Sequence, residues 1–380
     1  MSTRRTVLRA CAAAVAAPFV NRSRYALFAQ SGAEYSERAV RLVHESLVID
    51  MLNQFLYRRD MQNKLHDWLT KPGAFTHADF ERFRETGIHA ASFGEGADSY
   101  ESGVELFATW NSFLAAYPDW LLRVSMPGDF ERAKSTGRYG ILFGMQTSTH
   151  FRGPDDVDFF HGLGQRAGQL TYNFRTLSGD GAFEEANGGV SEFGVRIIER
   201  MNRVGMAVDC AHAGDRTMLD AFAISKKPVI ISHGGCRAVH PDYPRCATDE
   251  AIRAMAKTGG VIGINFISSM VKAHEPTTID DVIDHFEHVA KLVGIEHVGV
   301  GSDMGIESND FMPPAQLAQM LASMDPKYHI HHREAVEHLD HPKRLYDLTD
   351  GLIRRKFTDE HIRLVLGENW RRTLTQIWSV

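Results

Sequence analysis

Short apolar runs alternate with amphipathic segments along most of the chain, and this alternation constrains the fold more than any other feature. Each run has four to eight residues and is rich in Val, Ile and Leu, and four of the eight open at Gly or Pro. Near-continuous apolar strands separated by helices indicate a parallel sheet that is covered on both faces. Eight runs show this pattern: Leu47–Asp50, Gly87–Phe93, Gly140–Gln146, Ala167–Asn173, Met206–Ala213, Pro228–Gly235, Gly260–Phe266 and His297–Asp303.

Eight strand–helix units predict one (β/α)8 (TIM) barrel domain over residues 36–380. The chain has 380 residues, of which 43% are hydrophobic, and this is enough to bury one large α/β core. A doubly wound open sheet is the alternative architecture. No Gly-x-Gly-x-x-Gly motif follows the first run, however, and its absence from the sequence counts against a dinucleotide-binding fold.

The first 30 residues have the form of an export signal rather than of a folded element. The pair Arg4-Arg5 precedes the short apolar run Cys11–Val20, as in signals of the twin-arginine route. This run is too short to span a bilayer as a stable helix, and a basic tail is the alternative interpretation. We therefore expect an exported, periplasmic protein without a stable membrane span.

Charge and cysteine content exclude several classes of protein. The formal net charge is -6 and there is no long basic run, so nucleic acid is not an expected partner. Without Cys11 of the signal, three cysteines remain, and an odd number in so large a core argues against a disulfide framework.

Two histidines end successive apolar runs, His212 in the fifth and His233 in the sixth. Neighbouring parallel strands would deliver both imidazoles to the same rim of the barrel, where active sites of this fold lie. Such a pair forms half of a zinc site, with Asp303 as a further ligand or as the base that takes a proton. Cys210 is a minor candidate ligand, since it shares a strand face with His212. The alternatives are two satisfied buried imidazoles and a helix N-cap at Asp303.

Other polar residues are expected at the same rim because they also end apolar runs. Carboxylates and amides among them could bind substrate or metal. They are Asp50, Asn53, Glu95, Gln146, Asn173, Asp209 and Asn265.

Several motifs together resemble the membrane (renal) dipeptidase family, peptidase M19 of the amidohydrolase superfamily. They are Asp-Cys-Ala-His, Ser-His-Gly-Gly-Cys-Arg-Ala-Val, His-Val-Gly-Val-Gly-Ser-Asp, Leu-Thr-Tyr-Asn and Gly-Glu-Asn-Trp. The resemblance implies an amidohydrolase-like barrel that carries two zinc ions and hydrolyses dipeptides, in a protein that is often dimeric. It also implies that His212 and His233 bind the second metal, that Asp303 contacts the first metal and acts as acid and base, and that Arg245 holds the substrate carboxylate.

The chain departs from the family at the first metal. The resemblance places Leu52 where the family has a histidine, Gln54 where it has an aspartate, and Gln146 where it has the bridging glutamate. A histidine of the substrate site falls at or near Phe174. Leucine cannot bind a metal and a neutral amide poorly replaces a bridging carboxylate, so we expect one zinc ion rather than two, with none as the alternative.

These residues predict an exported metal-dependent hydrolase that acts on a dipeptide or a peptide-like amide. His212 and His233 would bind the metal, Asp303 would move the proton, and Arg245, Asn173 and Gln146 would bind the substrate. The alternatives are a non-hydrolytic enzyme on the same barrel and a non-catalytic maturation or binding protein derived from a dipeptidase.

Overall fold

The computed structural model describes residues 24–26, 34–56, 62–241, 243–307 and 331–379, and also residues 313, 315, 318, 319 and 322. The predicted export signal therefore lies outside the described residues, except for strand β1 (Arg24–Ala26). This strand pairs antiparallel with β2 (Glu34–Ser36), which leads into helix α2 (Glu37–Glu45).

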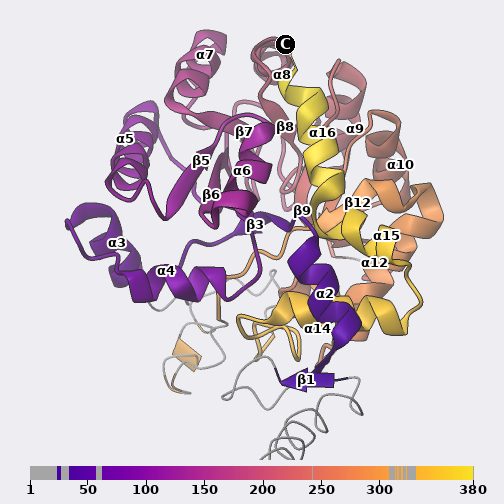
Figure 1. Ribbon diagram of the computed structural model, residues 1–380. Coiled ribbons are helices and arrows are strands. Elements are labelled where there is room, and N and C mark those ends of the chain that lie inside the picture. Colours follow the sequence, from indigo (N-terminus) through magenta and orange to yellow (C-terminus); the bar gives the residue numbers. More distant parts are fainter. Residues whose placement is uncertain are drawn as a thin grey trace, which may run out of the picture.

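Eight parallel strands form the centre of the molecule, surrounded by helices (Figure 1). Their order in the sheet is β9, β11, β12, β3, β4, β6, β7 and β8. Each of the eight predicted apolar runs contains or overlaps one of these strands. The strands are β3 (Ile49–Asn53), β4 (Ala90–Phe93), β6 (Tyr139–Met145), β7 (Gln165–Gln169), β8 (Ala207–Asp209), β9 (Ile231–Cys236), β11 (Ile262–Ile264) and β12 (Val298–Val300).

The sheet closes into a barrel between β8 and β9. A parallel bridge joins Asp209 to Ile230, just before β9. The amide of Cys210 donates to the carbonyl of Ile230 at 2.9 Å, and the amide of Ile230 donates to the carbonyl of Val208 at 3.0 Å. This closure confirms the predicted (β/α)8 barrel and rules out the open sheet.

Two further strands lie beside the barrel strands and were not predicted. Strand β5 (Leu121–Val124) pairs in parallel with the first half of β6, and β7 takes over as the neighbour of β6 from Phe143 onward. Strand β10 (Cys246–Ala247) pairs in parallel with the end of β9 and so places residue 245 at the barrel mouth.

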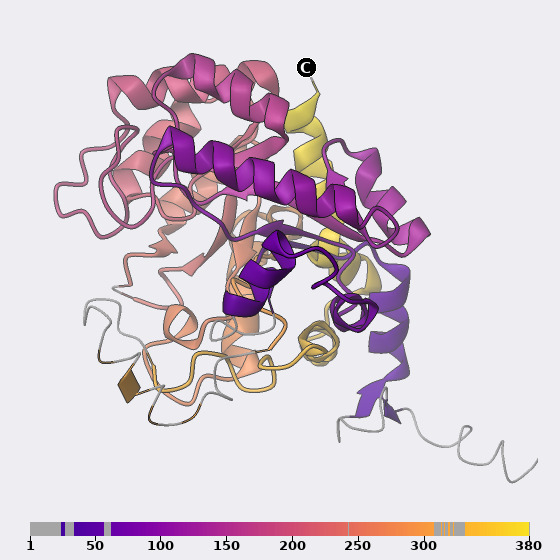
Figure 2. The same ribbon diagram turned by 90° about the vertical axis from the view of Figure 1, so that its left-hand side faces the viewer.

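The helices lie outside the strands, and Figure 2 shows α5 crossing the outer surface of the barrel. Several begin at a Ser or Thr N-cap, because its side-chain oxygen accepts a backbone amide that the first turn leaves unbonded. The α-helices are α2 (Glu37–Glu45), α3 (Gln62–Thr70), α4 (His77–Arg84), α5 (Tyr100–Ala116), α6 (Gly128–Thr136), α7 (Pro154–Leu163), α8 (Glu192–Val204), α9 (Asp215–Ile224), α10 (Asp249–Lys257), α11 (Ser268–Val271), α12 (Ile279–Val293), α14 (Arg344–Arg354), α15 (Asp359–Arg363) and α16 (Asn369–Trp378). A 3-10 turn (Ile295–His297) precedes β12, and a π-helical turn (Leu364–Glu368) joins α15 to α16.

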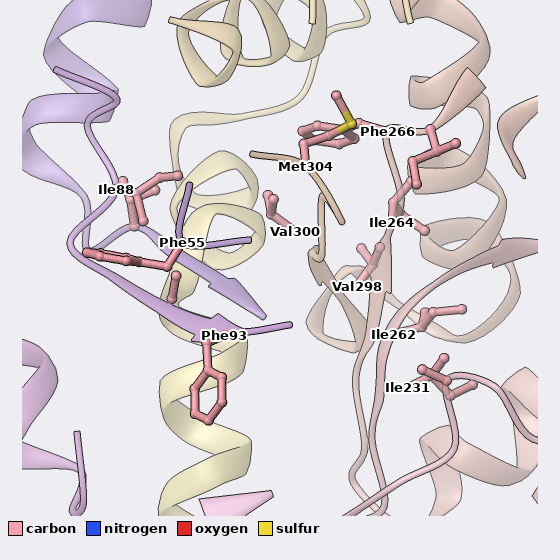
Figure 3. Packing of buried hydrophobic residues seen from close by; sticks show 14 of the residues in the cluster. Phe55, Ile88, Phe93, Ile231, Ile262, Ile264, Phe266, Val298, Val300 and Met304 are labelled. Carbon is pink, nitrogen blue, oxygen red and sulfur yellow. The ribbon is translucent and has the colours of Figure 1, made fainter. Parts of the chain in front are cut away.

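The core has two parts. The larger lies between the strands and the outer helices, and Figure 3 shows Ile262 of β11 near its register partner Val298 of β12. The smaller combines strand residues such as Ile49 with Trp370 and Leu374 of α16. Helix α16 also bonds to the backbone around β12, since Nδ2 of Asn369 donates to the carbonyls of Ile295 and Val298 at 2.8 Å each. It therefore covers the end of the barrel at which the strands begin.

In the part of the chain that the structure describes, no helix combines the length and the apolar character needed to cross a membrane.

Candidate active site

The two strand-end histidines meet at the carboxyl end of the barrel. His212 follows β8 and His233 lies within β9, the two strands between which the barrel closes. Their Nε2 atoms are 3.1 Å apart, and both side chains are buried. The pairing expected from the sequence is therefore present in space.

Each imidazole is held in place through its other ring nitrogen. Nδ1 of His212 lies 2.8 Å from Oδ1 of Asn173, and Nδ1 of His233 lies 2.9 Å from Oγ of Ser232. Burial, and then the positive charge of Arg245, holds the pKa of both histidines well below the usual value. Both rings are thus neutral at pH 7, the form in which imidazole binds a metal.

Arg245 is a buried cation beside this pair. It is 2% exposed, and its Nη1 donates to the carbonyl oxygen of Ala211. Among the described residues, its Nε and Nη2 atoms have no hydrogen-bond partner. Buried N–H groups of a guanidinium without an acceptor are costly, and together they match the two oxygens of a carboxylate. The side chain is therefore arranged to bind an anion.

Asp303 lies three residues beyond β12, where the backbone adopts a left-handed conformation with φ of 58°. Its amide donates to the carbonyl of Leu52 at 2.8 Å, which fixes the residue at the mouth. The carboxylate accepts a bond from Nδ2 of Asn265 at 3.2 Å and a longer one, 3.5 Å, from Nε2 of Gln54. Non-glycine residues in this backbone region are uncommon and concentrate at functional sites.

The three residues predicted to replace the ligands of a first metal converge around Gly94. A Cβ atom built on this glycine would lie 3.3 Å from Nε2 of Gln146, 3.4 Å from Cγ of Gln54 and 3.6 Å from Cδ1 of Leu52. Nε2 of Gln146 donates to the carbonyl of Gly94 at 2.9 Å. These side chains contain no anionic group, so their position does not fit a metal ion.

The distance between the two Nε2 atoms is compatible with a metal ion between them, whereas the side chains around Gly94 offer no anionic ligand. Two nitrogens on one tetrahedral zinc, each at about 2.0–2.1 Å, would be roughly 3.3 Å apart, close to the observed 3.1 Å. Within the described ranges, no group of three or more His, Cys, Asp and Glu side chains could hold a metal. Burial raises the pKa of Cys210 well above its usual value, which disfavours the thiolate that a metal would need.

Two contacts at the site were missed by the sequence reasoning. The ring of Tyr172 stacks on His212, with centroids 4.0 Å apart and planes inclined by 23°. The second contact joins Oγ of Ser232 to the ring of His233. Phe174, near which the resemblance places a histidine of the substrate site, has 43% of its surface exposed. Tyr172 stands directly before Asn173 in the Leu-Thr-Tyr-Asn motif, and this position in the sequence could have indicated that Tyr172 lies at the site.

The remaining predicted rim residues occupy separate positions. Glu95, just beyond β4, accepts the amide of Gln146 through its backbone carbonyl at 2.9 Å, and burial raises the pKa of its carboxyl. Asp50 accepts bonds from Ser302 and from Asn53, away from the histidines. The catalytic, metal-binding and substrate-binding roles assigned to the rim residues stay predictions.

Comparison with protein families gives one match over most of the chain. The model for "Membrane dipeptidase (Peptidase family M19)" matches residues 36–326. Dipeptidase verJ of Clonostachys rogersoniana is 36% identical over 196 residues, 51% of this chain and 50% of its own length. Dipeptidase tcpJ of Claviceps purpurea (strain 20.1) is 28% identical over 271 residues, 70% of this chain and 58% of its own. The chain thus spans only about half the length of these curated relatives.

Solved structures share the fold over nearly their full length. An amidohydrolase from Pseudomonas aeruginosa has a TM-score of 0.75 and 28% identity, and the match covers 90% of this chain and 99% of that one. The probable dipeptidase PvdM from the same organism has a TM-score of 0.73 over 90% and 98% of the two chains. At 16% identity, this second likeness shows the fold alone.

Proposed function

Because the chain belongs to the membrane dipeptidase family (Peptidase family M19), we propose that it is an exported hydrolase of a dipeptide or peptide-like amide that uses one metal ion rather than two. One observation carries the proposal. Two neutral imidazoles face each other at 3.1 Å beside Arg245, a buried guanidinium with two N–H-bearing nitrogens that lack an acceptor among the described residues.

Arg245 binds the carboxylate of the substrate in this proposal. Its Nε and Nη2 can donate in parallel to two carboxylate oxygens, which fixes the orientation as well as the position of the substrate. Because the same charge lies near His212 and His233, it also keeps both rings neutral. Substrates that lack a free carboxylate would leave the guanidinium buried and unpaired.

His212 and His233 would hold the metal through their Nε2 atoms. A bound zinc ion would supply Lewis-acid polarisation of the scissile carbonyl and would lower the pKa of water. The chain contributes the geometry: Asn173 and Ser232 orient the two rings through Nδ1, and Tyr172 packs on one of them. Asp303, held by Asn265 and its own backbone, takes up and returns the proton.

A non-hydrolytic or binding role is the second candidate, and one observation favours it. Leu52, Gln54 and Gln146 pack around Gly94 as a neutral cluster where the family resemblance places ligands of the first metal. An active site in which amides stand in place of two carboxylates, and an aliphatic side chain in place of an imidazole, would have a different chemistry. This second candidate function needs no bound metal, and the metal content of the protein therefore distinguishes it from the metal-dependent hydrolase.

Metal analysis of the purified protein, combined with substitution, tests the proposal. We expect one equivalent of zinc in the wild type, none in His212→Ala, and an unchanged content in His161→Ala, a control on α7. Hydrolysis of a panel of L,L- and L,D-dipeptides should follow the zinc content. A wild type without zinc under zinc-replete conditions, and without hydrolysis of any dipeptide, would sink the hydrolytic proposal and support the second candidate.

Export by the twin-arginine route to the periplasm is a separate proposal, supported by Arg4, Arg5 and the apolar run after them. Substitution of both arginines by lysine should leave the protein in the cytoplasmic fraction of a producing bacterium. Normal export of this variant would refute the route. A homodimer is also proposed, from the family resemblance, and sedimentation equilibrium decides it.

A further inference from the structure

The loop that follows β7 carries large apolar side chains that are exposed. Among the residues that the structure describes, five large hydrophobic side chains are exposed, and three of them lie within six positions of this loop: Tyr172 at 47%, Phe174 at 43% and Leu177 at 68%. The other two are Met126, just before α6, and Phe159 on α7. Apolar side chains that gather on a surface indicate a place where something binds.

The ring of Tyr172 belongs to the rim of the candidate active site. It stacks on the imidazole of His212, with centroids 4.0 Å apart. A Cβ atom at Gly181 would lie 2.3 Å from the carbonyl oxygen of Tyr172, so only glycine allows the chain to pass this close. Gly181 also bridges to Ala213, and the amide of Ala182 donates to the carbonyl of His212 at 2.8 Å. The segment 181–182 therefore holds Tyr172 and His212 together.

Hydrogen bonds hold the rest of this loop on the barrel. The hydroxyl of Thr176 donates to the carbonyl of Leu170 at 2.9 Å. Oγ of Ser178 lies 2.7 Å from Oγ of Ser148, which also donates to the carbonyl of Leu170 at 2.6 Å. The exposed side chains are thus presented from a fixed backbone. A preorganised surface loses little entropy when a ligand binds, and its contacts can therefore discriminate between ligands.

The charge in this loop is balanced within the loop itself. Arg175 is the one charged residue between Leu170 and Gly179. Its Nε and Nη2 donate to the two carboxylate oxygens of Asp180 at 2.6 and 3.2 Å, and Nη2 lies 3.8 Å from Oε1 of Glu184. A ligand that packs on the exposed rings therefore does not have to compensate this guanidinium.

The anion-binding group and the exposed ring lie on neighbouring residues of one segment. Nη1 of Arg245 donates to the carbonyl of Ala211, and the ring of Tyr172 lies on the next residue, His212. An extended dipeptide spans about 7 Å. A ligand whose carboxylate binds Arg245 can thus place one of its side chains on Tyr172.

We propose that Tyr172 and Phe174 form an apolar surface of the substrate site that selects substrates with a large aromatic or branched aliphatic side chain beside a free carboxylate. This inference rests on the proposed function, because it specifies the substrate class of the same site. Aromatic side chains bury a large apolar area and favour other rings through stacked or edge-to-face contacts. Substrates with only small side chains would gain nothing from this surface.

Three small probes without an amide bond test the inference, because a hydrolase cannot consume them. Butyrate carries a carboxylate alone, 4-phenyl-1-butanol carries a ring alone, and 4-phenylbutyrate carries both. Calorimetric titration of the purified protein gives the affinities. We expect 4-phenylbutyrate to bind about 10-fold more tightly than butyrate, the gain from burying one ring against another.

Substitutions show whether the two residues cause this ratio of affinities. Tyr172→Ser and Phe174→Ser should each lower the ratio, whereas Tyr172→Phe should keep it. A disturbance of His212 alone would weaken both probes alike and leave the ratio unchanged. Phe159→Ser is the matched control, since Phe159 is 42% exposed on α7 and should not affect the ratio. A wild-type ratio near 1, or an unchanged ratio in both serine variants, would overturn the inference.

The same probes separate a failure of this inference from a failure of the proposed function. Binding of butyrate without any gain from the ring would defeat the inference alone. Absence of butyrate binding would defeat the carboxylate site and with it the proposed function. In that case 4-phenyl-1-butanol decides the inference by saturation-transfer NMR. A transfer that is weaker in Tyr172→Ser than in the wild type would support the apolar surface, and equal transfer or none would refute it.

Discussion

Replacement of Arg245 by methionine should make the protein more stable and at the same time remove its ability to bind substrate. The side chain is 2% exposed, and among the described residues only the carbonyl of Ala211 accepts a bond from it. Methionine has a similar length and no charge, so it can fill the same space. The two expected effects have opposite signs, and this makes the prediction specific.

The magnitudes follow from burial and hydrogen bonding. Replacing buried charged groups by apolar residues of similar volume is often neutral or stabilising by about 1–4 kcal/mol, so we expect a gain of about 1–3 kcal/mol. With an unfolding entropy of about 2.1 cal/mol/K per residue, each kcal/mol raises the Tm of a domain of this size by about 1–2 °C. Loss of a charge-assisted double hydrogen bond should weaken carboxylate binding by about 2–4 kcal/mol, or about 30–1000-fold.

Calorimetry can measure both effects on the same samples. The Tm comes from thermal scans, and affinity comes from titration with a dipeptide and with the same dipeptide amidated at its carboxyl end. The wild type should prefer the free carboxylate, and Arg245→Met should bind both ligands equally weakly. Arg237→Met is the control, because Arg237 bonds to both oxygens of Asp215 and its loss should lower the Tm.

A lower Tm for Arg245→Met would mean that the guanidinium stabilises the fold, and a retained preference for the carboxylate would mean that it does not bind the substrate. Either result would refute the reasoning about the unpaired nitrogens.

Two further predictions concern metal content and pH. The triple substitution Leu52→His, Gln54→Asp and Gln146→Glu should raise the zinc content, measured by elemental analysis, by one equivalent over that of the wild type. The reason is that the three side chains converge around Gly94. An unchanged zinc content would show that the backbone around Gly94 no longer supports a metal site. The free energy of unfolding, measured in urea, should fall from pH 6 to pH 5, because burial lowers the pKa of His89, His150 and His285 to about 4 while the unfolded chain binds protons near 6.5. With about three such protons the steepest slope is about 4 kcal/mol per pH unit, and a flat profile over this interval would contradict the assignment.

The barrel could be predicted because parallel strands covered on both faces leave a pattern that does not depend on tertiary detail. Strand β5 was missed because Leu121–Val124 is short and contains the exposed Arg123. Strand β8 ends at Asp209, earlier than its apolar run, because the chain beyond that point turns toward the mouth. A buried turn and a buried strand have the same composition, so the sequence does not distinguish them.

The histidine pair was predictable for the same reason, since consecutive strand ends must meet at one rim. The partners that orient it were not. Asn173 reaches His212 across 39 positions, and the acceptor that Arg245 has among the described residues, the carbonyl of Ala211, lies 34 positions earlier in the chain. Such contacts follow from the closed barrel, and no local pattern encodes them.

The junction of β8 and β9, where the barrel closes, sets the spacing of the two histidines independently of the residues elsewhere at the rim. Beyond Ile230, the side chain of Asp209 rather than a backbone carbonyl receives the next amide, that of Ser232. The row of hydrogen bonds between β8 and β9 is therefore continued by a carboxylate, and the side chain of Asp209 acts as a spacer that fixes the distance between the two strands at this point. Mutations on the far side of the barrel, at Leu52 or Gln146, leave this spacer untouched. The separation of His212 from His233 is therefore set by the junction of β8 and β9 and not by the side chains that pack around Gly94.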